Sequence, residues 1–115
     1  MKKPLDDLVR LEHIIRSIDK IERYVDNLSY DDFYKSDIHK SAVTNELMII
    51  GEAVSRLSET IKDDFSETEW KGIKNLRNLV VHEYFAIDYS VIWELLKYNL
   101  TDLKKEIQGI LGKIK

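Results

Sequence analysis

The sequence contains no cysteine, one proline and four glycines among its 115 residues. Without cysteine, the chain can form no disulfide, no thiolate nucleophile and no cysteine-based zinc site. Strand-rich folds need more turn residues than this, whereas long helices need few. The expected fold class is therefore all-α.

Long hydrophobic runs and a basic excess are also missing. No segment approaches the roughly 18 uninterrupted apolar residues that suggest a membrane span, and the N-terminal MKKPLDDLVR is charged where a secretory signal would be apolar. We therefore expect a cytoplasmic protein without membrane contact. The net charge of −3 argues against a broad nucleic-acid-binding surface, so any RNA contact should be local. The length of 115 residues predicts one domain over 1–115.

Apolar residues recur at spacings of three, four and seven in several stretches, which is typical of amphipathic helices. The first stretch runs from Pro4 to about residue 28, and the polar segment 29–36 interrupts the pattern. The second runs from Val43 to Ile61. It has a further apolar row, formed by Ala42, Ile49 and Ala53. Such a helix lies centrally in a bundle or forms half of an interface between chains.

Two capping signals mark later helices. Ser66-Glu67-Thr68-Glu69 fits a capping box, which predicts a third helix that starts near residue 67. Asp88 can cap a fourth helix, in which apolar spacings of three and four continue from Trp93 to Ile110. The expected architecture is an up-and-down bundle of four main helices, with room for a short fifth around 62–65.

The third helix carries the run Arg77-Asn78-Leu79-Val80-Val81-His82-Glu83-Tyr84 at its C-terminal end. At about 100° per residue, Ile73, Leu76 and Val80 form its core stripe, with Tyr84 near the same line. The alternative to a functional role for the remaining polar residues is a solvated helix face.

Asn78 and His82 lie one turn apart on the polar face, and Arg77 lies between that face and the core stripe. Lys71 and Lys74 add a small positive field that can attract RNA. Histidine suits proton transfer because its pKa of about 6.5 keeps both forms populated near neutrality. Arginine can donate in parallel to two phosphate oxygens. These groups fit RNA cleavage by attack of the ribose 2′-hydroxyl on the adjacent phosphate.

One chain offers only one suitable histidine for the two proton transfers of this reaction. A two-fold dimer that brings two third helices together would supply two histidines and two arginines to one cleft. Dimerisation is therefore a requirement of this hypothesis, and the apolar row of the second helix offers a surface for it.

The run from Arg77 to Tyr84 resembles a known signature. Arg-x4-His with Asn directly after the Arg is similar to the motif of HEPN-superfamily ribonucleases, and the extension to Tyr84 resembles the HepT toxin branch. The flanking features that agree are Asn45-Glu46-Leu47, Ile50-Gly51-Glu52-Ala53, Trp70, Ile73, Tyr84-Phe85, Asp88 and Trp93. The resemblance extends from the first helix to about Leu103, and this ordered set is far more specific than the Arg-x4-His spacing alone.

This resemblance implies a homodimeric, metal-independent ribonuclease without a cofactor, acting as the toxin of a toxin–antitoxin pair. By motif position Arg77 and His82 would be catalytic, and Asn78 would support them. Tyr84 resembles the tyrosine that partner minimal nucleotidyltransferase antitoxins modify with AMP, which would add phosphate charge and bulk beside the cleft. Glu83, between His82 and Tyr84, departs from the family pattern. A carboxylate at this position would raise the pKa of His82 or repel the RNA substrate.

Two other functions stay open from the sequence. One is a non-catalytic HEPN-type module that holds a nucleotide or docks a nucleotidyltransferase, and the other is a helical interaction protein. His13 and His39 lack the spacing of a metal site and are expected on the surface. Of Glu46 and Glu52, which lie among apolar residues, one is expected to be buried and paired, in a structural role or a hydrogen bond of the dimer rather than in catalysis.

Overall fold

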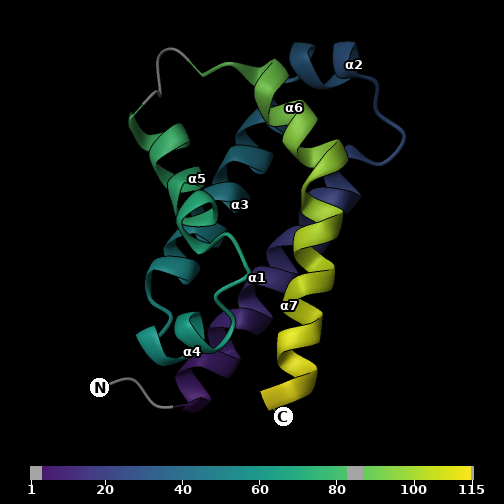
Figure 1. The fold of residues 1–115 in the computed structure, drawn as a ribbon. Coiled ribbons are helices and arrows are strands. Elements are labelled where there is room, and N and C mark those ends of the chain that lie inside the picture. Colours follow the sequence, from purple (N-terminus) through teal and green to yellow (C-terminus); the bar gives the residue numbers. More distant parts are fainter. Residues whose placement is uncertain (1–3, 83–86, 115) are drawn as a thin grey trace.

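The computed structural model describes the backbone of residues 4–82 and 87–114, and the side chains of residues 6–76 and 87–114. Within these ranges the chain forms helices and no strand, which confirms the all-α class (Figure 1). The helices are α1 Pro4–Val25, α2 Tyr30–Lys35, α3 Asp37–Ser55, α4 Glu59–Asp64, α5 Trp70–His82, α6 Tyr89–Tyr98 and α7 Leu100–Ile114. Successive long helices run in opposite directions, as expected for an up-and-down bundle (Figure 1).

Helix α3 is central because it packs on both α1 and α5, while α7 packs on α1 from the other side. Its inward residues, which include Val43, Leu47, Ile50 and Val54, are fully buried. The second apolar row is only partly covered: Ala53 is buried, whereas Ile49 remains 38% exposed. The expectation of a central helix is thus met, and part of the extra row stays open on the surface.

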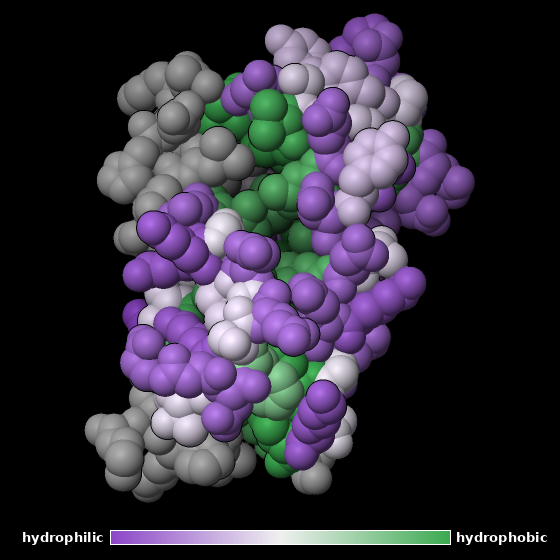
Figure 2. Space-filling view, in the orientation of Figure 1, coloured by the Kyte–Doolittle hydropathy of each residue, from purple (hydrophilic) through white to green (hydrophobic). Residues whose placement is uncertain are grey.

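The surface seen in the orientation of Figure 1 carries both polar and apolar side chains. Figure 2 shows polar residues at both sides of this face and apolar residues along its middle. No helix among the described residues combines the length and apolar character that a membrane crossing requires.

Helix α1 ends three residues before the expected boundary. The chain turns at Asn27, whose φ of 63° is in the left-handed region that asparagine tolerates better than most residues. The polar segment that follows contains a short helix instead of a plain loop. In α2, Ser29 accepts a hydrogen bond from the Asp32 amide, and the Asp32 side chain accepts one from the Ser29 amide. This capping box lets the segment bury Phe33 completely.

The expected second helix is divided in two at residues 56–58. Its apolar spacing continues through Leu57 and Ile61, but α3 ends at Ser55 and α4 begins at Glu59. Ser58 caps α4 by accepting from the Ile61 amide. Ser58 is itself held by Asp7 of α1, whose carboxylate accepts from the Ser58 amide at 2.9 Å and from its hydroxyl. The short fifth helix expected around 62–65 is therefore α4, placed a few residues earlier.

Replacing Asp7 by alanine is expected to lower the free energy of unfolding by about 2 kcal/mol, because it leaves the Ser58 amide and hydroxyl without their buried acceptor. Asp7 is only 6% exposed. Urea unfolding at fixed protein concentration measures the change, and Asp6→Ala, which removes an exposed neighbouring carboxylate, is the matched control. Equal stability of the two variants would contradict a structural role for this link.

The third and fourth helices also differ in detail from expectation. Helix α5 begins at Trp70, so the predicted capping box Ser66–Glu69 lies in the preceding turn and the expected start was three residues early. Asp88 caps α6 as predicted. The fourth helix bends at Asn99, which separates α6 from α7 (Figure 1). Backbone hydrogen bonds from Asn99 to Leu95 and from Leu103 to Asn99 pass through the bend and keep the two segments coupled.

Helices α1 and α7 are joined by an ion-pair cluster at their surface. The Lys104 ammonium lies 2.6 Å from Asp19 and 3.2 Å from Glu22. Hydrogen bonds to Asp19 and then to Glu22 raise the pKa of Lys104. The cluster adds charge complementarity to the apolar contact of the two helices.

Candidate functional site

Helix α5 is fixed on the bundle by one apolar face. Ile73 and Leu76 of the expected core stripe are buried, and so is Trp70, whereas the side chains of Val80 and Tyr84 lie outside the described residues. The Trp70 indole also donates a hydrogen bond to the Phe65 carbonyl at 3.0 Å, which ties the start of α5 to the preceding turn. Because α5 packs along α3, its direction and rotation about its own axis are set by the core.

The opposite face of α5 is open to solvent. Lys71, Lys74 and Asn75 are exposed. The helical backbone continues to His82, and positions 78 and 82 follow Asn75 by three and seven residues. Residues at these spacings share a face of a helix, so the backbone puts both positions in register with Lys71 and Asn75.

The side chains of Arg77, Asn78 and His82 lie outside the described residues, although their backbone belongs to α5. Position 77 follows Ile73 by four residues and Trp70 by seven, so it shares a side of the helix with these two buried residues. Tyr84, with Glu83, falls outside the described residues altogether. The catalytic and modification roles of these residues stay predictions.

The chain after the motif is anchored where α6 begins. The Asp88 carboxylate accepts hydrogen bonds from the hydroxyl and the amide of Ser90, the latter at 3.0 Å. The Ser90 hydroxyl, followed by its amide, lowers the pKa of Asp88. Asp88 is therefore ionised at neutral pH and holds the first turn of α6 through charge-assisted hydrogen bonds.

An aromatic cluster that the sequence did not reveal supports the same end of the bundle. Phe33 of α2 lies with its ring centroid 5.2 Å from that of Trp93 and 6.1 Å from that of Tyr89. The Lys40 ammonium lies 4.9 Å from the ring centroids of Tyr89 and Tyr34. These contacts join α2, α3 and α6, so the first half of α6, which follows the motif in the chain, is packed on the bundle.

The other candidate residues have structural surroundings. His13 is exposed, as expected, but His39 is half-buried and its Nδ1 lies 2.6 Å from the Ser36 hydroxyl that caps α3. Glu46 is the buried member of the two glutamates, at 5% exposure. Its Oε1 has no hydrogen-bond partner in the described part of the structure, so the expectation that it is paired is not met at that atom. Glu52 lies half-exposed, 3.9 Å from Arg56.

No group of three or more histidine and carboxylate side chains within the described ranges is arranged to hold a metal ion. Arg10 and Arg56 were not singled out from the sequence, although they line the same groove between α1 and α3. Nothing in the pattern could have paired them, since helical spacing relates residues within one helix and not between two.

Known proteins similar to this chain agree on one family. The model of a family described as "Ribonuclease HepT-like" matches residues 14–110. A protein of Caldanaerobacter subterraneus subsp. tengcongensis named "Putative RNase TTE0752" is 35% identical over 105 residues, covering 91% of this chain and 94% of that protein. "Putative RNase MJ1216" of Methanocaldococcus jannaschii is 32% identical over 104 residues, covering 90% and 86% of the two chains.

"Probable ribonuclease HepT" of Thermococcus cleftensis is 30% identical over 100 residues, covering 87% of this chain and 91% of that protein. No solved structure matches the chain significantly. The family model spans most of the bundle, from α1 to the last turns of α7, and includes the whole of α5. The chain therefore belongs to the HepT-like ribonuclease family.

Proposed function

We propose that this protein is a metal-independent endoribonuclease that acts as the toxin of a toxin–antitoxin pair. The proposal is supported by the helical backbone of α5, whose spacing puts positions 78 and 82 in register with the exposed Lys71 and Asn75, in a chain of this family. A face used only for solvation would not need a histidine and an amide at these positions in a family of ribonucleases.

The proposed reaction is transesterification. His82 of one subunit takes the proton of the ribose 2′-hydroxyl, whose oxygen attacks the adjacent phosphorus. The bond from phosphorus to the 5′-oxygen breaks, and the histidine of the second subunit gives that oxygen a proton. Arg77 neutralises the charge that develops on the phosphate oxygens, and Asn78 supports it by hydrogen bonding. The products are a 2′,3′-cyclic phosphate and a 5′-hydroxyl.

Helix α3 supports the dimer that this mechanism requires. Its outer face carries a row with spacings of four, three and four residues, formed by Ile38, Ala42, Asn45 and Ile49. Ile38 is 81% exposed, although it is a large apolar side chain. Such spacing suits a helix that packs against a second helix along one seam, with the asparagine fixing the register. Because α5 packs along α3, a two-fold contact here would bring two α5 helices towards one cleft.

The test of this function is incubation of the purified protein with RNA in the presence of EDTA. We expect fragments that end in a 2′,3′-cyclic phosphate, detected by mass spectrometry. Fragments that carry a 3′-hydroxyl, or cleavage that EDTA stops, would contradict the mechanism.

A charge introduced into the α3 row of Ile38, Ala42, Asn45 and Ile49 is expected both to separate the subunits and to stop RNA cleavage. Ile38→Glu places a carboxylate in the proposed seam without disturbing the core, since Ile38 is exposed within one chain. Light scattering should show the monomer, and RNA cleavage should fall at least about a hundredfold. Asp37→Asn, an exposed neighbour outside the row, is the control. A fully active monomer would rule out the composite site.

The exposed face of α6 supports contact with a nucleotidyltransferase partner. Val91 is 48% exposed and Tyr98 75% exposed, and both lie with Leu95 on one side of the helix. Helix α6 starts five residues after Tyr84, so an enzyme that transfers AMP to Tyr84 would reach this apolar face. Mass spectrometry of Tyr84 after co-expression with a neighbouring nucleotidyltransferase tests this role, and an unmodified tyrosine would count against it.

A further inference from the structure

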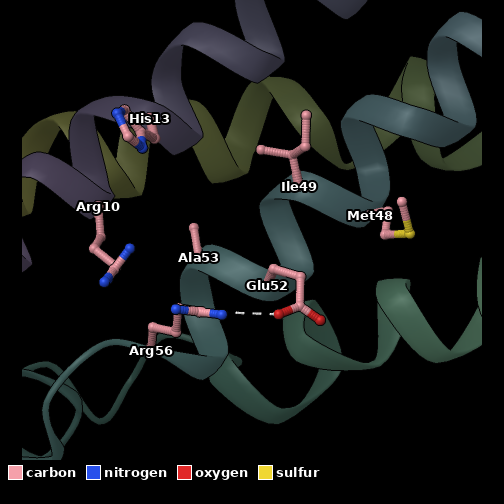
Figure 3. A pocket seen from close by; sticks show the side chains of 7 residues that line it. All are labelled: Arg10, His13, Met48, Ile49, Glu52, Ala53 and Arg56. Carbon is pink, nitrogen blue, oxygen red and sulfur yellow. Dashed lines mark ion pairs between the residues drawn. The ribbon is translucent and has the colours of Figure 1, made fainter.

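A groove with a volume of about 480 Å³ lies between α1 and α3 (Figure 3). Arg10 and His13 line it from α1, and residues between Met48 and Arg56 line it from α3. Its size falls within the range of roughly 300–1,000 Å³ that is typical of small-ligand sites. It begins where the exposed α3 row ends at Ile49, so the outer half of the row, around Ile38, lies beyond it.

Arg10 brings a partly buried guanidinium to this groove. Its side chain is half-buried, and its Nε is shielded from solvent with no hydrogen-bond partner. Within the described part of the chain, Asp7 lies one turn away on α1, but both of its carboxylate oxygens accept hydrogen bonds from Ser58. A buried guanidinium N–H that lacks an acceptor within the described residues favours binding of an anion from outside.

Arg56 adds a second guanidinium at the same end of the groove (Figure 3). Its Nε lies 3.9 Å from the Glu52 carboxylate, and its side chain is 61% exposed. An ion pair this long and this exposed is weak, so Arg56 can turn to a better acceptor at little cost. Two guanidiniums and one carboxylate leave this end of the groove positive in a protein whose net charge is −3.

The other end of the groove is apolar. Met48 and Ile49 lie there, and Ala53 forms part of the wall between this end and the arginines (Figure 3). Ile49 is 38% exposed, and the flexible thioether of Met48 can adapt to a flat group. A ligand that fits has a phosphate at one end and a flat, weakly polar group a few ångströms away, which is the arrangement of a nucleotide.

We propose that this groove binds one nucleotide unit of an RNA strand, with Arg10 and Arg56 on its phosphate and Met48 and Ile49 against its base or ribose. The assignment of RNA as the source of the phosphate rests on the proposed ribonuclease function. The groove would act as a second contact that holds the strand while cleavage takes place at α5. Glu52 opposes the anion, so it limits the affinity of this contact.

Fluorescence anisotropy of the full chain with a labelled 2′-O-methyl RNA tests the groove without cleavage, since this RNA lacks the attacking hydroxyl. Arg10→Gln combined with Arg56→Gln is expected to weaken binding about tenfold. The slope of log affinity against log salt should fall by about 0.7, the value for one lost phosphate contact to a single strand. Glu52→Gln should strengthen binding.

Arg16→Gln is the matched control, because Arg16 is an exposed arginine of α1 outside the groove. Arg56→Gln alone guards against misfolding, since its side chain is mostly exposed. If the double variant binds as tightly as Arg16→Gln, the groove is not a phosphate site. AMP and an unlabelled RNA can be compared as competitors, with the RNA concentration expressed in nucleotides. If AMP displaces the labelled RNA at the lower concentration, the site binds a free nucleotide and the RNA assignment is wrong.

The same assay separates this inference from the proposed function. Binding that depends on Arg10 and Arg56, in a protein that does not cut unmodified RNA, would support the groove and contradict the ribonuclease mechanism. Cleavage by the wild-type protein, with RNA binding that is unchanged in the Arg10 and Arg56 variants, would support the ribonuclease mechanism and contradict the groove.

Discussion

Replacing His82 by alanine is expected to reduce RNA cleavage by a factor of about 10² to 10⁴, because no other group at the proposed cleft can exchange a proton near neutral pH. Arg77→Ala should have an effect of similar size, since it removes the charge that stabilises the phosphate in the transition state. Single-turnover cleavage of a labelled RNA measures both losses. The helical fold should remain in both variants, as circular dichroism can verify.

The controls for these variants are exposed cations of α1 and α5. Arg16→Ala removes an exposed arginine from α1 and should leave the cleavage rate unchanged. Lys74→Ala removes an exposed cation from α5 and should weaken RNA binding with little change in the rate of the bound complex. Cleavage by His82→Ala at the wild-type rate would show that the motif is not catalytic. A non-catalytic binding module would then remain, and its RNA or partner binding should still depend on Arg77.

Replacing Phe33 by alanine is expected to lower the free energy of unfolding by about 3–5 kcal/mol, the usual cost of removing a fully buried aromatic ring. Phe33 is 0% exposed and packs against Trp93 and Tyr89, so its loss would also loosen the start of α6. Urea unfolding at fixed protein concentration measures the loss. The concentration must be fixed because dimerisation would add to the apparent stability.

Tyr34→Ala is the matched control for Phe33→Ala, because Tyr34 lies in the same short helix and is 52% exposed. Its replacement should cost less than about 1 kcal/mol. Equal costs for the two variants would mean that α2 is not anchored through Phe33. A large loss for Phe33→Ala alone would show that a six-residue helix stabilises the end of the bundle.

The helix pattern could be predicted from the sequence where one apolar face packs on the core. The stripe of Ile73 and Leu76 in α5 and the cap at Asp88 are both present. The divisions at residues 56–58 and at Asn99 were missed because apolar spacing continues across them. A helix can turn or bend while its next apolar residues still reach the core, so periodicity alone does not locate such points.

The helix starts predicted from capping signals differ from the structure in two places. Ser29 and Asp32 form a capping box that was overlooked inside a polar stretch, whereas Ser66 and Glu69 fit the same pattern without starting a helix. Both signals are followed four residues later by a buried aromatic side chain, Phe33 in α2 and Trp70 in α5, so burial does not distinguish the two cases. The helix starting at Trp70 instead follows a turn that is closed by its own indole hydrogen bond to Phe65.

The candidate site divides in the same way. The polar face of α5 follows from spacing within one helix, so Lys71 and Lys74 were expected in the open and are exposed. The groove depends on Arg10 of α1 and Arg56 at the C-terminal end of α3, which come together only through the packing of α1 on α3. Such a site becomes visible only in three dimensions.

The pairing of α1 with α7 has a consequence for synthesis of the protein. Part of the apolar face of α1 is covered by α7, which follows it by most of the sequence. At translation rates of about 5–20 residues per second, that face of α1 stays uncovered for on the order of ten seconds before α7 is synthesised. The bundle therefore cannot close, nor a composite site form, until α7 has left the ribosome. Under the proposed toxin function, a cell that makes this chain would have that interval in which to synthesise the antitoxin.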